Sequence, residues 1–166
     1  MPNKSAWLFI IILAVILGSC DSNRVFDEYK SVPNKWLKDS IISFQVNPPD
    51  SINPYNLFVN VRNTNNYKFS NLFLIVEMVY PHGKTIKDTL EYQMAKPNGE
   101  LLGEGITDIK ENKLWYKGYD KTFKFEEIGD YKINIQQAMR NNGDINGVDN
   151  LEGITDVGFR IENTNK

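Results

Sequence analysis

The chain has 166 residues, with 19 basic and 21 acidic side chains and a formal net charge of −2. This mild and evenly spread balance excludes a protein that binds nucleic acid through a basic patch. A single cysteine and a single histidine exclude a disulfide framework and a zinc site built from several His or Cys ligands. We therefore expect no cofactor, no metal and no nucleic-acid partner.

The first element is an apolar run from Ala6 to Leu17, which follows Lys4 and contains no charged residue. A helix of this length reaches only ~18 Å, well short of the ~30 Å hydrocarbon core of a bilayer. A membrane-spanning helix is therefore not expected. A basic start, a short apolar core and small residues after it are typical of a secretory signal peptide.

The residues that close this run are Leu17-Gly18-Ser19-Cys20. They resemble a lipobox, at which a signal peptidase cleaves before a cysteine that already carries lipid. We predict that residues 1–19 are a lipoprotein signal peptide, that cleavage falls between Ser19 and Cys20, and that Cys20 is the lipidation site. The alternative is an ordinary signal peptide that ends near a cysteine. Two or three acyl chains would make the membrane a durable partner, outside the cytoplasm.

Residues 20–40 are mostly polar but include Phe26, Tyr29 and Trp36. We interpret them as a lipid-anchored tether that is partly docked on the domain, because these aromatic side chains favour burial. From residue 41 onward, apolar residues alternate with polar ones, which is the pattern of strands. The pattern predicts a domain over 41–162 and a frayed C-terminus over 163–166.

The expected strands are 42–46, 57–61, the central strand 69–80 and its hairpin partner 86–94, one that begins at 123–125, then 131–139 and 155–162. Residues 95–121 are the least regular part, because four glycines interrupt them. No 3.6-residue periodicity is visible after the signal peptide. The sequence therefore predicts an all-β fold, a two-sheet antiparallel β-sandwich of the Ig-like or Greek-key kind.

A local feature supports the sandwich: Tyr131 follows Gly129 by two residues at the start of the 131–139 strand. This spacing resembles a tyrosine corner, in which the phenol bonds to upstream backbone where the chain crosses between sheets. The alternative is a plain glycine turn before a strand with an inward tyrosine.

Catalytic residues are not expected. His82 lies in a predicted turn, where a solvated side chain is the usual role, and the adjacent acids Glu126 and Glu127 face opposite ways on a strand. We predict a protein that is not an enzyme and has no small-molecule substrate.

The loop 142–150 has Asn142, Asp144, Asn146 and Gly147 at the first, third, fifth and sixth places of a calcium-binding loop. Its twelfth place is Gly153 instead of Glu. Asn, Asp and Gly also dominate ordinary turns. The sequence alone leaves open whether this loop binds calcium, and turns explain it adequately.

Four residues are candidates for contact with a partner. Trp115, Tyr116 and Tyr119 could stack on a glycan or a protein, or they could cap the open end of the sandwich as core residues. Arg62 lies on a strand and faces away from the apolar side, where it could serve an interface or form a cross-strand pair with a Glu.

The order of several short motifs carries a family resemblance over more than a hundred residues outside 106–121. They are Cys20, Tyr29, Trp36, Tyr55-Asn56-Leu57, Val61-Arg62-Asn63, Tyr67, Asn71-Leu72-Phe73-Leu74, Pro81, Gly83, Asp88-Thr89-Leu90-Glu91, Gly99, Gly103, Gly105, Gly129, Tyr131, Gln136, Met139-Arg140, Leu151-Glu152-Gly153-Ile154 and Asp156-Val157-Gly158. In these the chain resembles the gliding motility lipoprotein GldH family of Bacteroidota.

This resemblance implies a non-catalytic lipoprotein of the cell envelope that acts in gliding as an assembly or scaffold subunit. The implied partners are other envelope proteins of gliding and type IX secretion. Residues 21–24 lack the acidic run expected after the cysteine of surface-exported lipoproteins in this phylum, so we expect a domain that faces the periplasm. Two rival interpretations are a surface glycan-binding lipoprotein that uses Trp115, Tyr116 and Tyr119, and an enzyme with a carboxylate pair built across strands.

Overall fold

The computed structural model describes residues 21–33, 35–105 and 108–164. These residues form ten strands: β1 Arg24–Ser31, β2 Lys35–Leu37, β3 Ile42–Val46, β4 Tyr55–Thr64, β5 Asn71–Val79, β6 Thr85–Gln93, β7 Ile109–Lys117, β8 Tyr131–Gln137, β9 Asn150–Glu152 and β10 Ile154–Asn163. Within these ranges no helix is long and apolar enough to cross a bilayer. The predicted signal peptide and Cys20 lie outside the described residues.

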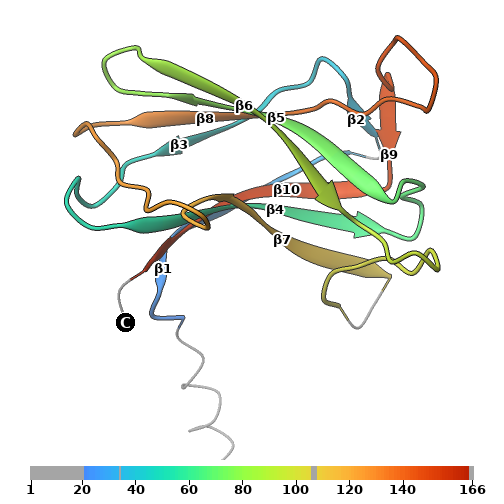
Figure 1. The fold of residues 1–166 in the computed structure, drawn as a ribbon, viewed down its shortest axis with the longest axis horizontal. Coiled ribbons are helices and arrows are strands. Elements are labelled where there is room, and N and C mark those ends of the chain that lie inside the picture. Colours follow the sequence, from blue (N-terminus) through green and yellow to red (C-terminus); the bar gives the residue numbers. More distant parts are fainter. Residues whose placement is uncertain (1–20, 34, 106–107, 165–166) are drawn as a thin grey trace, which may run out of the picture.

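Two antiparallel four-stranded sheets make up the fold (Figure 1). One has the strand order β1-β10-β4-β7 and the other β3-β8-β5-β6, while β2 and β9 form a small two-stranded sheet at one end. The two larger sheets pack face to face, as the two layers of Figure 1 show. The predicted all-β sandwich is confirmed.

The core lies between these layers and follows the two-residue alternation of the strands. On β5 the side chains of Leu72, Leu74, Val76 and Met78 are fully buried, and β5 lies between β8 and β6 as the predicted central strand. The opposite layer contributes alternating residues of β4 and β10, among them the fully buried Phe159. Alternation predicted these strands because one face of each is covered by the other sheet.

Two expectations about the middle of the chain are wrong. Residues 95–121 contain a regular nine-residue strand, β7, which pairs with β4 along its length. Conversely, 123–125 is not a strand but makes one isolated bridge, in which the amide of Tyr55 donates to the carbonyl of Phe123 at 2.9 Å. The alternation of apolar residues in this segment arises because the side chain of Phe125 is fully buried in the core. The ring centroids of Phe125 and Tyr131 are 4.9 Å apart.

The segment 20–40, interpreted from sequence as a partly docked tether, contains strand β1. This strand pairs with β10 from Arg24 to Ser31, with one irregularity near Phe26. Trp36 on β2 is fully buried, and its indole donates to the carbonyl of Ser40 at 3.0 Å. The sandwich therefore begins only a few residues after Cys20.

Candidate interaction surface

The solvent-facing side of the sheet β1-β10-β4-β7 carries an unusually dense set of polar and aromatic side chains. We call this side the outer face. Because side chains alternate along a strand, the residues between the core positions all project here. They are Asp27, Tyr29, Phe58, Asn60, Arg62, Glu111, Lys113, Trp115, Arg160 and Glu162.

Two side chains, Tyr29 and Glu111, together bridge the whole width of this face. Tyr29 starts on edge strand β1, and its hydroxyl donates to Glu111 on the opposite edge strand β7 at 2.8 Å. The same hydroxyl accepts from the side-chain amide of Asn60 on β4 at 2.9 Å. The crossing is possible because β10 has Gly158 in between, where an added Cβ would lie 2.9 Å from the Tyr29 ring. A glycine inside a predicted strand signals such a close approach, and Gly158 within the expected strand 155–162 is the sequence signal for this crossing.

Arg62 contacts both of the other members of this cluster. Its Nε lies 2.8 Å from Glu111, and its Cζ lies 4.1 Å from the centroid of the Tyr29 ring. Burial raises the pKa of Glu111, but the bonds from Arg62 and Tyr29 outweigh it and hold that pKa below its usual value. Burial and the bond to Glu111 raise the pKa of Tyr29. The cluster thus keeps one carboxylate, one guanidinium and one neutral phenol in fixed positions.

A second cluster is organised by Arg160, which is only 13% exposed. Its guanidinium lies 2.7 Å from Asp27 and 2.6 Å from Glu162, and it also bonds Asp21. Burial alone would lower the pKa of Arg160, but these three carboxylates raise it. Lys113 joins the cluster through Glu162 at 2.6 Å and lies 4.1 Å from the ring centroid of Phe58.

The three aromatic candidates do not act together. Trp115 is 40% exposed and packs on Phe58 with ring centroids 4.3 Å apart, and Tyr119 is 79% exposed. Tyr116 points into the core instead, where burial raises its pKa and its hydroxyl bonds Asp88 at 3.0 Å. The planes of Trp115 and Tyr119 are tilted by 55°, so they do not form a flat platform. Tyr116 is therefore a core residue, while Trp115 and Tyr119 remain available to a partner.

Gly129 and Tyr131 lie at the crossing between the sheets. The hydroxyl of Tyr131 accepts from the amide of Glu127 at 2.8 Å and donates to the carbonyl of the same residue at 3.0 Å. This phenol-to-backbone bonding is the kind that defines a tyrosine corner. Gly129 has a φ of 130° and packs against Pro81.

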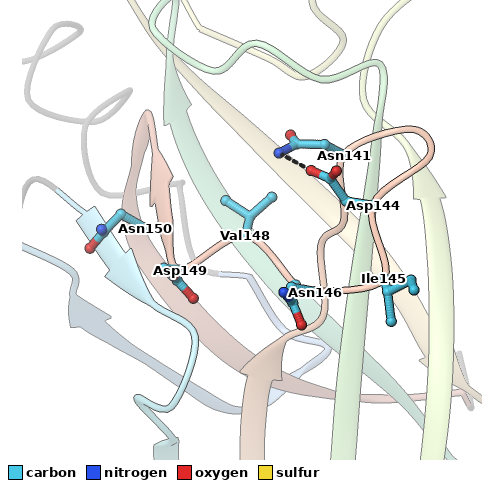
Figure 2. A pocket seen from close by; sticks show the side chains of 8 residues that line it. Asn141, Asp144, Ile145, Asn146, Val148, Asp149 and Asn150 are labelled. Carbon is cyan, nitrogen blue, oxygen red and sulfur yellow. Dashed lines mark hydrogen bonds between the residues drawn. The ribbon is translucent and has the colours of Figure 1, made fainter.

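The loop 141–150 surrounds a shallow pocket of about 490 Å³ (Figure 2). The side-chain amide of Asn141 donates to Asp144 at 3.0 Å, and Ile145 projects away from this pair. In the described part of the chain no group of three or more His, Cys, Asp or Glu is placed to hold a metal ion. Gly153, the twelfth position of the calcium pattern, joins β9 to β10, and an added Cβ there would lie 2.3 Å from the backbone nitrogen of Tyr67. Close packing therefore explains this glycine.

The histidine and the acidic residues considered as catalytic candidates form hydrogen bonds or ion pairs with neighbouring side chains. The ring of His82 lies 2.8 Å from the Glu127 carboxylate, and the amide of His82 donates to the same group at 3.0 Å. Both bonds lower the pKa of Glu127, the one from the amide most. Glu104 and Glu111 line one cavity of about 750 Å³, but Glu111 is bonded to Arg62 and Tyr29 there.

Comparison with known proteins shows the family to which the chain belongs. A family model described as GldH lipoprotein matches residues 24–161. The chain belongs to the GldH lipoprotein family. It is 58% identical to the gliding motility lipoprotein GldH homolog of Christiangramia forsetii, over 93% of this chain and 94% of that one. It is also 58% identical to gliding motility lipoprotein GldH of Flavobacterium johnsoniae, over 92% and 93% of the two chains.

Among solved structures, a structure of the Gt strain of infectious bursal disease virus aligns at a TM-score of 0.39 with 13% identity, over 84% of this chain and 31% of that one. The family model and the two relatives identify this GldH family member as a gliding motility lipoprotein of the cell envelope. The family resemblance inferred from the sequence is confirmed.

Proposed function

We propose that this lipoprotein is a non-catalytic assembly subunit of the gliding machinery, anchored through lipid on Cys20 and binding another envelope protein with its outer face. Cleavage between Ser19 and Cys20 leaves Cys20 as the first residue of the mature chain. The single observation that carries the proposal is the arrangement of Tyr29, Arg62 and Glu111, whose mutual contacts hold all three side chains in place on the outer face.

Preorganisation of this kind favours association. A partner that meets fixed arginine and aromatic side chains does not have to immobilise them, which removes part of the entropy loss of binding. Arg, Tyr and Trp are also the residue types that dominate the binding energy of protein interfaces. Trp115 and Tyr119 add an exposed aromatic edge beside the same face, with centroids 5.5 Å apart.

The proposed partners are proteins of gliding and type IX secretion, and the domain faces the periplasm. The sequence Asp21-Ser22-Asn23-Arg24 supports this orientation, because it lacks an acidic run after Cys20. Treatment of intact cells with protease tests it. The domain should stay intact on whole cells and be degraded once the outer membrane is permeabilised, whereas degradation on whole cells would contradict the orientation.

The binding role is tested by complementing a gene deletion with Trp115→Ala, and separately with Arg62→Glu. We expect reduced colony spreading with each, together with weaker recovery of co-purifying envelope proteins from detergent extracts. Leu37→Ala is the matched control, because Leu37 is 55% exposed but lies on β2, away from the outer face. Normal spreading with both outer-face variants at normal membrane levels would refute the binding role.

A further inference from the structure

The chain is fixed to the sheet almost immediately after the residue proposed to carry lipid. Cys20 precedes Asp21, whose carboxylate bonds Arg160 and whose carbonyl accepts from the amide of Arg24 at 3.3 Å. The amide of Asn163 donates to the carbonyl of Asn23 at 2.9 Å. Neighbouring Cα atoms are only about 3.8 Å apart, so an acyl group on Cys20 starts within a few ångströms of the sandwich. No spacer separates the domain from the bilayer.

The end of the sandwich that meets the lipid is therefore defined by topology. It is the end where β1 starts and β10 finishes, and it also carries the loop 47–54, the turn 80–84 and the connection 118–130. Figure 1 shows these three connections projecting together on the left, on the same side as the C-terminus. They are tied to one another: Asn47 donates to Asp130 at 3.1 Å, and the amide of His82 donates to Glu127 at 3.0 Å. Thr164, after β10, also donates to the carbonyl of Pro54 at 3.1 Å. We call this region the anchor end.

Three large apolar or aromatic side chains are exposed to solvent at the anchor end. Ile52 is 75% exposed in the loop 47–54, and Tyr119 and Ile128 are 79% and 85% exposed in the connection 118–130. The loops that present the two isoleucines are held in shape. Asp50 accepts from the amides of Ile52 and Asn53 at 2.8 and 2.7 Å, and the Tyr131 hydroxyl holds the backbone of Glu127, next to Ile128.

We propose that the anchor end lies against the lipid surface, with Ile52 and Ile128 inserted at the boundary of headgroups and acyl chains and Tyr119 at headgroup level. This proposal rests on the lipidation of Cys20 proposed above. Apolar side chains gain by entering this boundary, and tyrosine prefers it because one end of its ring is apolar and the other polar. Exposed apolar residues such as Ile145 also occur at the opposite end. The position of the anchor, and not exposure alone, therefore selects the lipid-facing end.

Charge does not drive this contact. Lys121 and Lys124 are exposed in the connection 118–130, but Asp120, Glu126, Glu127 and Asp130 lie in the same segment. Glu126 is paired with Lys84 at 2.8 Å. Acidic side chains outnumber basic ones in this connection by four to two. Insertion should therefore not require anionic lipid, and it should persist when salt is raised from about 0.1 to about 1 M, which shortens the screening length from ~10 to ~3 Å.

The orientation also assigns the opposite end of the molecule. Strands β2 and β9 and the loop 141–150 point away from the bilayer, and the outer face stands beside it with its strands rising from the lipid surface. A protein partner on the outer face would then be reached laterally, along the membrane.

Site-directed labelling tests the proposal in the full acylated chain. Because the chain has one cysteine and lipid would occupy it, a new cysteine is the only reactive thiol. The variants Ile52→Cys and Ile128→Cys, with Ile145→Cys as the control at the opposite end, are labelled with a bimane fluorophore. Each is reconstituted into phosphatidylethanolamine vesicles that contain a lipid with a nitroxide on its acyl chain.

We expect several-fold stronger quenching at positions 52 and 128 than at position 145, retained in high salt and not increased by added phosphatidylglycerol. Mass spectrometry of the same samples establishes whether Cys20 is acylated. Acylated protein with equal or no quenching at the three positions would overturn this orientation but leave the lipid anchor in place. The same result would be obtained if a protein partner, and not lipid, covered the anchor end. Protein without acyl groups at Cys20 would overturn the proposed anchoring and this inference together. Unfolding temperatures equal to that of the unsubstituted chain confirm that the labelled variants are folded.

Discussion

The guanidinium of Arg62 lies over the ring of Tyr29, with its Cζ 4.1 Å from the ring centroid, and both side chains bond the carboxylate of Glu111. Three strands of one sheet thus contribute to a single cluster, which the fourth strand permits by having a glycine at the crossing. The cluster belongs to the solvent side of the sheet, where isolated charged residues are the common arrangement. Its energetics can be measured apart from its role in binding.

Gly158→Ala should destabilise the fold by about 1–3 kcal/mol, because the new Cβ would lie 2.9 Å from two carbons of the Tyr29 ring. Urea unfolding measures the change. The same substitution in a Tyr29→Ala background should have a much smaller effect, since the clash partner is gone. Equal effects in the two backgrounds would show that the ring does not limit this position.

Arg62→Lys should lower stability by about 0.5–1 kcal/mol even though it keeps the charge, because an ammonium group cannot both stack on Tyr29 and bond Glu111 in one plane. The small size follows from the exposure of the pair, 37% for Arg62 and 43% for Glu111. A double-mutant cycle with Glu111→Gln measures the coupling by chemical denaturation. A coupling energy of zero would contradict the geometry.

Tyr131→Phe should destabilise the domain by about 1–2 kcal/mol, because the backbone of Glu127 loses two hydrogen bonds to the phenol. Tyr119→Phe is the matched control, since that ring is 79% exposed, and it should change the free energy of unfolding by less than about 0.5 kcal/mol. Thermal unfolding followed by circular dichroism compares the two. Equal effects would argue that the corner hydroxyl is not stabilising.

Acid should weaken the loop 47–54. The amide and side chain of Asn53 and the amide of Ile52 hold the pKa of Asp50 at about 2, below its ordinary value of 3.8. A carboxyl whose pKa is depressed by folding stabilises the native state at higher pH, and this contribution is lost as pH falls from about 4 towards about 2. The difference in unfolding temperature between the native chain and Asp50→Ala should therefore shrink over that range. A difference that is constant from pH 6 to pH 2 would exclude this role.

Gly153→Ala and Gly143→Ala separate backbone strain from steric exclusion. Both glycines have a φ of 87°. A Cβ added at Gly153 would meet the backbone of Tyr67, whereas a Cβ added at Gly143 would have no other atom within 4 Å. We expect about 1 kcal/mol of destabilisation at Gly143, from strain alone, and about 3 kcal/mol or more at Gly153. Denaturant midpoints measure both. Similar losses would mean that the β9–β10 joint can adapt.

The site was predictable only in parts. Arg62 was placed on the outward side of its strand with a cross-strand glutamate as one of two roles, and its neighbour on β7 is Glu111. The sequence predicts that Tyr29 docks on the domain, but its target Glu111 lies on the opposite edge strand with two strands in between, and no local pattern encodes that distance. The 115–119 aromatics formed one group in the sequence. The fold divides them, because adjacent residues of a strand face opposite ways.

Alternation along each chain segment was enough to establish the all-β class and the central strand β5, because a strand with one covered face must alternate. The order of short motifs along the chain was enough to indicate the family. Alternation failed for β1 and β7. Both are edge strands whose inner sides include polar residues such as Lys30 and Asn112, and these are accommodated by partners far away in the chain, Ser43 for one and Asn63 for the other. Which strands become neighbours depends on closing the whole sandwich over its core. Only that closure brings Tyr29 to Glu111 and places the start of β1 beside the loops of Ile52 and Ile128.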